Sequence, residues 1–321
     1  MLIAWKGAKS SRTEMFWKIR EDKFELNLCL SFFIERGAFS YSELKKLLGD
    51  IKMKKLGVFT ALTLAAGLLA GCSGNAESSE LSEEKLVVGV TSGPHEQIME
   101  KVAEVAAEDG LEIELKVFTD YVLPNTALAE GDLDVNSYQH KPFLDAFNED
   151  HDTKLVPGAT TILNPMGVYS NEYSSVEDLP KGATFGLPND PTNGARALFI
   201  LEEAGIITLK EGTEETASIF DVEENPQELE FIELEAAQIP KQLSELDAAA
   251  INTNWAIEAG LNTLEDSILL ESSESPYVNY IVTREENKDD AVLEKLNAAY
   301  QSDEVRAFIE EEFDGAVLPI W

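Results

Sequence analysis

The sequence predicts an α/β protein with two lobes and a polar cleft between them. Two groups of short apolar strands, each alternating with amphipathic helices, follow one another along the chain, which is the pattern of sheets covered by helices. In both groups, polar and aromatic residues stand where strands end. The chain has 321 residues, of which 44% are hydrophobic, so it is long enough for two globular domains with separate cores.

The first group of elements opens with a βαβ unit. Residues 86–90 are continuously apolar, as in a buried parallel strand, and a helix over residues 95–108 places Ile98 and Val102 on one face. A second strand is expected over residues 113–118. Beyond this unit we expect a loop over residues 119–125, a short strand ending near 140, a helix over 141–148 and an interrupted strand over 161–169.

The second group follows Asn164-Pro165-Met166-Gly167, an interruption that suits a crossover between lobes. Its expected elements are strands over residues 183–187, 229–234 and 248–251, a helix around Asn193 and Arg196, and a helix near 240–246. A strand over residues 278–282 is predicted to return to the first lobe, and residues 291–311 are predicted to form one closing helix. The first lobe is therefore expected to contain residues 85–165 and 275–321, and the second residues 166–274.

The charge is strongly negative and unevenly distributed. The formal net charge is -35; residues 1–71 carry 12 basic and 7 acidic side chains, which leaves 13 basic and 53 acidic side chains, a net of -40, for residues 72–321. This balance excludes nucleic acid as a partner, because phosphate binding needs clustered cations. It also argues against peripheral docking on anionic lipid. We interpret the acidity as a device that keeps the surface hydrated.

A secretory signal begins inside the chain. Residues 53–55 are Met-Lys-Lys, residues 56–70 are apolar or small, and Gly71-Cys72 follows, which is the order of a signal peptide and its cleavage site. The apolar run has 15 residues, too few for a membrane-spanning helix, which needs about 20. Residues 53–71 are therefore predicted to be a signal peptide.

The end of this signal, Leu69-Ala70-Gly71-Cys72, resembles the lipobox of bacterial lipoproteins. The resemblance implies that Cys72 is acylated, becomes the first mature residue and anchors the protein on the extracytoplasmic face of the cell membrane. Residues 72–84 are polar and are expected to form a flexible tether. Residues 1–52 precede a signal that has its own methionine, so we interpret them as an upstream extension from a start codon assigned too early.

A turn after the strand over residues 183–187 is expected to bind an anion. Pro188 and Pro191 stiffen it, and Thr192 and Asn193 are expected to cap a helix whose free backbone N–H groups would attract a carboxylate. Arg196, expected in the first turn, adds a planar set of donors that matches a carboxylate. Positive charge is rare elsewhere, which favours this interpretation over an ordinary turn with a solvated arginine.

Seven residues at strand ends form the candidate site. Two α/β lobes with a polar cleft describe a hinged solute-binding protein. Each residue also has a structural alternative, such as a core aromatic or a helix cap. The seven are Tyr121, Tyr138 and His140 from the first lobe, Asn193, Arg196 and Asn252 from the second, and Asn279 near the return crossing.

Six segments in this order resemble the NlpA/MetQ family of methionine-binding lipoproteins: DYVLPN, DVNSYQHKPFLD, PMGVYS, LPNDPTNGARALFILEEAG, INTNWA and SPYVNYIVTR. The resemblance covers residues 86–321. It implies a two-lobed type II periplasmic-binding-protein fold with the ligand cleft between the lobes. It also implies that the protein delivers methionine, which we expect to be L-methionine, to an ABC importer composed of a permease and its ATPase, and that it has no enzymatic activity and no cofactor.

The resemblance also assigns roles to the seven residues. Arg196 would hold the α-carboxylate, and Asn193, Asn252 and Asn279 would hydrogen-bond the amino-acid backbone. Tyr121, Tyr138 and His140 would surround the thioether, since a polarizable sulfur packs well against rings. The family often has Glu before Gly where this chain has Gly194-Ala195, and often Phe where it has Tyr138. Another amino acid or a methionine-containing dipeptide therefore stays open as the ligand.

Other classes of protein fit the sequence less well. A secreted hydrolase is the main alternative, but the chain has only three histidines and has neither a Gly-x-Ser-x-Gly nor a His-Glu-x-x-His motif. Paired carboxylates among the 53 acidic residues keep that alternative open. A metal receptor would need clustered histidines, which are missing, so no metal is expected.

Overall fold

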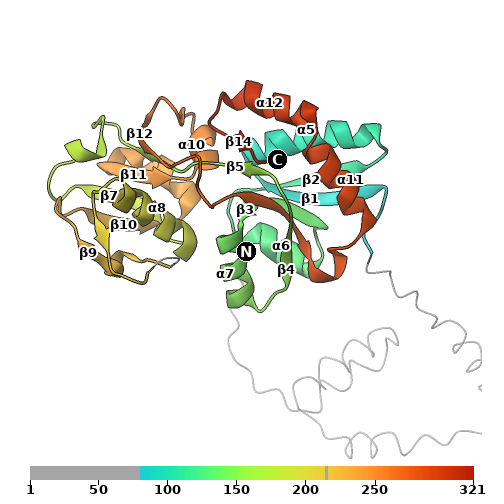
Figure 1. The fold of residues 1–321 in the computed structure, drawn as a ribbon, viewed down its shortest axis with the longest axis horizontal. Coiled ribbons are helices and arrows are strands. Elements are labelled where there is room, and N and C mark those ends of the chain that lie inside the picture. The colour runs from blue at the N-terminus through green and yellow to red at the C-terminus, as the bar shows by residue number, and fades with distance from the viewer. Residues whose placement is uncertain (1–79, 214–215) are drawn as a thin grey trace, which may run out of the picture. The chain divides into compact units, whose positions relative to one another are not determined.

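Two five-stranded mixed sheets form the cores of the molecule (Figure 1). The computed structural model describes residues 80–213 and 216–321, within a unit that extends from Asn75 to Trp321. The predicted extension 1–52, the signal peptide 53–71, Cys72 and the tether up to residue 79 lie outside the described residues. Within the described ranges, no helix has the length and apolar character needed to cross a bilayer.

The first sheet has the strand order β2-β1-β3-β13-β4. Strand β1 runs parallel to β2 and β3, whereas β13 is antiparallel to β3 and β4. The strand predicted to return late in the chain therefore does pair with the early strands, as β13. The bounds are β1 (Lys85–Thr91), β2 (Glu112–Phe118), β3 (Val135–His140), β4 (Leu155–Thr160) and β13 (Asn279–Arg284).

Helices cover both faces of the first sheet because its strands are apolar on both sides. Leu86, Val88 and Val90 of β1 are fully buried among residues of α5 (Pro94–Glu108), α11 (Ala291–Tyr300) and α12 (Asp303–Phe313). Val87 points to the opposite face, where it packs with residues of α6 (Leu123–Glu130) and α7 (Lys141–His151). This alternation follows from the two-residue period of a strand.

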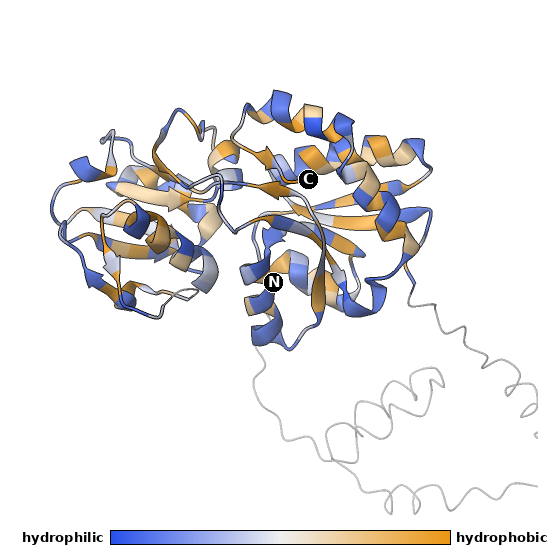
Figure 2. Cartoon of the chain, viewed as in Figure 1, coloured by the Kyte–Doolittle hydropathy of each residue, from blue (hydrophilic) through white to orange (hydrophobic). Residues whose placement is uncertain are grey.

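The second sheet has the order β10-β7-β11-β6-β12. Strand β11 carries only small and branched residues. Ala248 and Ala250 pack toward α8 (Pro191–Glu203), whereas Ala249 and Ile251 pack toward α9 (Ile239–Gln242) and α10 (Thr253–Glu258). The bounds are β6 (Gly167–Tyr169), β7 (Thr184–Pro188), β10 (Glu230–Leu234), β11 (Ala248–Ile251) and β12 (Ser267–Leu270). Both sheets are mainly hydrophobic in Figure 2, and the helices show hydrophilic outer faces.

Short elements complete the described chain. Two small antiparallel pairs join β5 (Ile162–Leu163) to β14 (Leu318–Pro319) and β8 (Thr208–Leu209) to β9 (Val222–Glu224). The 3₁₀ helices are η1 (Val176–Asp178), η2 (Ile219–Asp221), η3 (Ala236–Gln238), η4 (Leu243–Glu245) and η5 (Glu285–Asn287).

Two segments connect the two sheets. The first crossover, residues 164–166, leads from β5 to β6, and the second crossover, residues 271–278, leads from β12 to β13. The interruption predicted at Asn164 to Gly167 is thus a connection between sheets. Both crossovers pass beside the site described below.

Three predicted elements differ from the structure. The closing helix is two helices, because Ser302 caps α12: its Oγ accepts the Val305 N–H at 3.2 Å. The loop over 119–125 is partly helical, because the Asp120 carboxylate accepts the N–H groups of Val122 and Leu123, so α6 begins at Leu123. The helix near 240–246 is the short α9 followed by the 3₁₀ helix η4.

We predict that Ser302→Ala lowers the free energy of unfolding by about 1 kcal/mol, because the first turn of α12 loses its cap. Urea unfolding followed by circular dichroism measures this change. Ser273→Ala is the matched control, since Ser273 is exposed on the second crossover and caps no helix. An equal loss in both variants would contradict the capping role.

Candidate ligand-binding site

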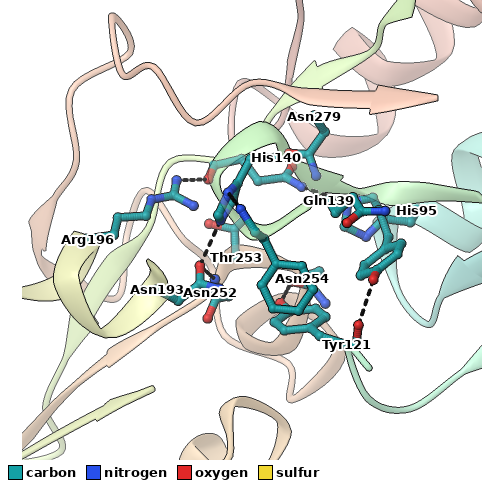
Figure 3. Close-up of a pocket in the computed structure, with 13 residues that line it drawn as sticks. His95, Tyr121, Gln139, His140, Asn193, Arg196, Asn252, Thr253, Asn254 and Asn279 are labelled. Carbon is teal, nitrogen blue, oxygen red and sulfur yellow. Dashed lines mark hydrogen bonds between the residues drawn. The ribbon is translucent and has the colours of Figure 1, made fainter. Parts of the chain in front are cut away.

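A polar pocket lies between the two sheets, lined by side chains from both (Figure 3). The lining encloses about 350 Å³ of atom-free space, part of which is open to solvent. The lining residues are His95, Tyr121, Tyr138, Gln139, His140, Phe143, Asn164, Asn193, Arg196, Asn252, Thr253, Asn254 and Asn279. All seven residues predicted from strand ends are therefore brought together around one pocket.

The residues of the first sheet reach the pocket from the end of β3 and its neighbours. Tyr138 and His140 lie on β3, and Asn279, the first residue of β13, pairs with His140 in the strand register. Tyr121 comes from the loop after β2. Beneath them the amides of Asn125 and Gln139 hydrogen-bond each other at 2.8 Å and 2.6 Å, which fixes the start of α6 against β3.

The start of α8 corrects the predicted anion-binding turn. Asp190 is the N-cap, in place of Thr192 and Asn193. Its carboxylate accepts a hydrogen bond from the Asn193 backbone N–H at 2.9 Å, and two more, from the Thr192 hydroxyl and the Asn193 side-chain amide, each at 3.0 Å. The helix terminus is thus already satisfied by a carboxylate of the chain itself. Burial raises the pKa of Asp190, opposed by the hydrogen bonds from Asn193 and Thr192.

Arg196 lies in the second turn of α8, not the first, because the helix begins at Pro191. Its guanidinium is buried against Glu271, with Nε donating to Oε1 at 2.9 Å and Nη2 donating to Oε2. Nη2 also donates to the Asn164 carbonyl at 2.8 Å. The predicted solvated-arginine alternative is therefore wrong: the side chain is 4% exposed and bidentately paired.

His140 combines a structural and a site-facing role. Its Nδ1 accepts the Phe143 N–H at 3.2 Å, which caps α7, so its Nε2 carries the proton and donates to Asn193 Oδ1 at 3.2 Å. Burial, reinforced by the charge of Arg196, lowers the pKa of His140 to about 3. The imidazole is neutral at physiological pH and can face an uncharged ligand group.

Aromatic rings form the opposite wall of the pocket. Tyr121 and Tyr138 are stacked with centroids 5.9 Å apart, and Phe143 meets both edge-on at 5.9 Å and 6.2 Å. Trp255 approaches Tyr121 at 5.4 Å. Tyr138 donates its hydroxyl to the Tyr121 carbonyl at 2.6 Å, and burial raises the pKa of both tyrosines, which therefore stay protonated.

Hydrogen bonds join the two sides of the pocket. Tyr121 donates its hydroxyl to Asn254 Oδ1 at 2.6 Å, and His140 donates to Asn193. At the rim, Ser92 donates to Glu258 at 2.6 Å. The side chains of the first sheet thus contact those of the second directly across the pocket.

Three buried amide atoms in the lining have no hydrogen-bond partner among the described residues: Asn164 Oδ1, Asn252 Oδ1 and Asn254 Nδ2. Two are acceptors and one is a donor. Because burying an amide group without a hydrogen bond is costly, such atoms indicate a polar ligand. Nowhere in the described ranges do three or more histidine, cysteine or carboxylate side chains gather to hold a metal ion.

Comparison with known proteins assigns the chain to a family. The model of the NlpA lipoprotein family matches residues 86–321. The chain belongs to the NlpA lipoprotein family. It is 42% identical over 272 residues to the D-methionine-binding lipoprotein MetQ of Escherichia coli (strain K12). The aligned region covers 83% of this chain and 99% of that protein. The resemblance predicted from the six segments is confirmed.

Solved structures of NlpA relatives share the fold. A nutrient binding protein from Burkholderia cenocepacia bound to methionine has a TM-score of 0.73 and 44% identity, covering 74% of this chain and 100% of that chain. An ABC transporter periplasmic substrate-binding protein from Coxiella burnetii has a TM-score of 0.71 and 40% identity, covering 73% and 100%. The predicted two-lobed type II periplasmic-binding-protein fold is thereby confirmed.

Sequence reasoning missed several residues of this NlpA pocket. Asn164 belongs to the interruption Asn164 to Gly167, and Asn254 belongs to the segment INTNWA. Both are polar residues in segments already singled out, so both could have been predicted. His95 follows Gly93-Pro94 at the start of α5 and had no such signal. Glu271, which pairs with Arg196 from outside the lining, stands in an acidic, serine-rich segment that suggests only a solvated loop, yet it is buried.

His95 is held neutral by its surroundings. Asn164 Nδ2 donates to its Nε2 at 3.1 Å, so Nδ1 carries the proton and donates to Thr91 Oγ at 2.8 Å. Burial lowers the pKa of His95 from 6.5 to about 4. Between these values the unfolded chain binds a proton that the folded chain does not, so stability is lost as the pH falls.

We predict that the free energy of unfolding falls between pH 7 and pH 5 by roughly 2 kcal/mol more in the parent than in His95→Gln, because the variant lacks this histidine. Urea unfolding at the two pH values gives the comparison. An identical slope in the parent and His95→Gln would contradict the assignment.

Proposed function

We propose that this protein is a lipid-anchored extracytoplasmic solute-binding protein that captures methionine and delivers it to an ABC importer with its permease and ATPase. One observation carries the proposal: a buried pocket sets a guanidinium and unpartnered amide oxygens opposite a wall of aromatic rings. Such a site matches a small zwitterion with an apolar tail. The names of the relatives, which include methionine-binding proteins and an ABC transporter component, support it.

The polar end of methionine is proposed to lie beside Arg196. Arg196 Nη1 donates to no acceptor among the described residues, so it is available to the α-carboxylate. Asn252 Oδ1 is available to the ammonium group, and Asn279 completes the hydrogen bonds to the amino-acid backbone. Asn193 accepts from Asn252 Nδ2 at 2.8 Å and so positions Asn252 beside the ligand. A buried zwitterion needs such partners for both of its charges.

The thioether is proposed to lie against the rings of Tyr121 and Tyr138, beside His140. Sulfur makes favourable contacts with aromatic ring edges, and the neutral imidazole presents no charge to it. Phe143 extends the same wall. This arrangement distinguishes methionine from amino acids with charged side chains, which would lose their hydration here.

An enzymatic role is less well supported. Among the described residues that line the pocket there is no serine, cysteine or carboxylate, and the Thr253 hydroxyl donates to the Pro165 carbonyl. A hydrolase would need a nucleophile paired with a base, so we propose binding without catalysis.

We predict that the ligand-free protein binds methionine and that Arg196→Lys weakens binding by about 10- to 150-fold, the loss of one hydrogen bond to a charged group, about 1.5 to 3 kcal/mol. Lysine keeps the charge next to Glu271 but lacks the planar set of donors. Calorimetric titration with L-methionine and D-methionine measures both the affinity and the preferred enantiomer.

The control for this titration is Arg306→Lys. Arg306 also lies over an aromatic ring, 4.9 Å from the centroid of Trp321, but on α12 and outside the pocket lining. It should bind methionine as the parent does. Absence of binding in the parent would overturn the proposed function, whereas binding by folded Arg196→Lys within threefold of the parent would remove Arg196 from the site.

The lipid anchor rests on the sequence around Cys72, which lies outside the described residues. We propose that residues 53–71 are removed, that Cys72 carries lipid and that residues 1–52 are absent from the mature protein. A diacyl anchor holds a protein stably at a membrane, where a single acyl chain does so only marginally.

We also propose the two lobes as they were expected from the sequence. The first lobe contains residues 85–165 and 275–321, and the second contains residues 166–274.

We predict that Cys72→Ala moves the protein from the membrane fraction to the soluble fraction, because the acylation site is lost. Fractionation and immunoblotting measure the distribution, and intact-mass analysis of the parent identifies its first residue. Cys29→Ala, the change at the other cysteine, should leave the distribution unchanged. A variant still bound to membranes, or a mature parent that retains residues 1–52, would contradict the assignment.

A further inference from the structure

Arg196 has a fixed partner behind the pocket, Glu271, which is not itself a lining residue. The two side chains are 4% and 5% exposed and meet through two parallel hydrogen bonds, from Nε and from Nη2. The pair joins α8 of the second sheet to the first residue of the second crossover. Arg196 therefore presents only the remaining part of its guanidinium to the pocket.

Glu271 is itself held from several directions. Its Oε2 accepts the Met166 N–H at 2.9 Å, and its Oε1 accepts the Ser275 hydroxyl at 2.8 Å. Its backbone N–H donates to the Met166 carbonyl at 3.0 Å, which ties the second crossover to the first. A carboxylate with this many fixed donors cannot turn away from Arg196 without leaving them unsatisfied.

The other surfaces of the guanidinium are also occupied. The ring of Tyr277 covers its face, with Cζ 4.5 Å from the centroid, and Nη2 donates to the Asn164 carbonyl at 2.8 Å. Both Tyr277 and Asn164 belong to the crossovers. The direction in which Arg196 can donate to a ligand is thus set by Glu271 and the two crossovers together.

The charges around the pocket do not sum to a positive value. His95 and His140 are neutral, as are Tyr121 and Tyr138. The charge of Arg196 is matched by Glu271 in direct contact, and the carboxyl group of Asp190 lies at the start of the same helix. A ligand carrying only a carboxylate would therefore meet one guanidinium and a carboxylate behind it, in a buried site where charges interact strongly.

A zwitterion meets a different balance. Its ammonium group adds a positive charge to the same buried site, and it can donate to the unpartnered acceptors Asn164 Oδ1 and Asn252 Oδ1. A ligand that lacks the ammonium group leaves those oxygens without a donor, which is the arrangement that rejects analogues most strongly.

We propose that Glu271 is a specificity-determining positioning residue: it orients Arg196 and cancels its charge, so that the pocket selects amino-acid zwitterions over carboxylates that lack an ammonium group. The inference rests on the proposed function, because it concerns the same pocket. It adds the class of ligand that is rejected and the residue responsible.

The experiment compares L-methionine with 4-(methylsulfanyl)butanoate, which keeps the carboxylate and thioether but lacks the ammonium group. Calorimetric titration of the parent should show strong preference for methionine. In Glu271→Gln the side chain keeps its size and loses its charge, so the ratio of the two affinities should fall by about tenfold or more. A loss of stability alone would weaken both ligands and leave this ratio unchanged.

Two further variants separate charge from position. Glu271→Asp keeps the charge but shortens the side chain, so it should weaken both ligands while preserving the parental preference. Glu274→Gln removes a charge from an exposed position on the same crossover and should change neither affinity. These variants are compared only after thermal unfolding shows that each is folded.

Each outcome bears on the proposal. The role of Glu271 would be contradicted if folded Glu271→Gln kept the parental ratio of the two affinities, or if Glu274→Gln lowered that ratio as much as Glu271→Gln does. Either result would leave methionine binding by the parent intact. If Glu271→Gln does not fold, the parent and Glu271→Asp are compared instead. The proposal would be contradicted if the parent bound 4-(methylsulfanyl)butanoate within threefold of its affinity for methionine, or if Glu271→Asp lost the preference for methionine. A parent that binds neither ligand would instead contradict the proposed function.

Discussion

The buried ion pair between Arg196 and Glu271 is the interaction on which the polar half of the pocket depends. Neither side chain is more than 5% exposed, and removing one partner of such a pair typically costs about 3 to 5 kcal/mol, because the other is left buried and uncompensated. Through Asn164 and Met166 the pair also contacts the first crossover, and Glu271 is the first residue of the second crossover. The orientation of Arg196 in the pocket and the connection between the two sheets therefore depend on the same contacts.

The rest of the pocket is built to avoid further charge. Its histidines are neutral because burial disfavours their protonated forms, and its tyrosines stay protonated for the same reason. Amides supply the remaining polarity, and they can serve either charge of a zwitterion. A site of this kind can enclose a small dipolar molecule, because each buried charge finds a partner and the apolar tail finds the rings of Tyr121 and Tyr138.

Much of this arrangement follows from sequence, and the reason is geometric. Apolar runs such as residues 86–90 and 248–251 are typical of buried strands. Residues at the carboxyl ends of strands in both sheets face the same pocket, Tyr138 and His140 from β3 of the first sheet and Asn252 from the end of β11 in the second. Glu271 had no such signal, because its pairing with Arg196 spans 75 residues and depends on the crossover. The cap at Asp190 competed with equally good candidates at Thr192 and Asn193, and only the start of the helix at Pro191 decides among them.

A crystal structure of the protein grown with L-methionine would show the orientation of the ligand. We expect the α-carboxylate within hydrogen-bond distance of Arg196 Nη1 and the Arg196–Glu271 pair intact. The ammonium group should face Asn252, and the sulfur should lie among the rings of Tyr121 and Tyr138. Methionine in the reverse orientation, or bound outside the pocket while Arg196 contacts only Glu271, would contradict this expectation.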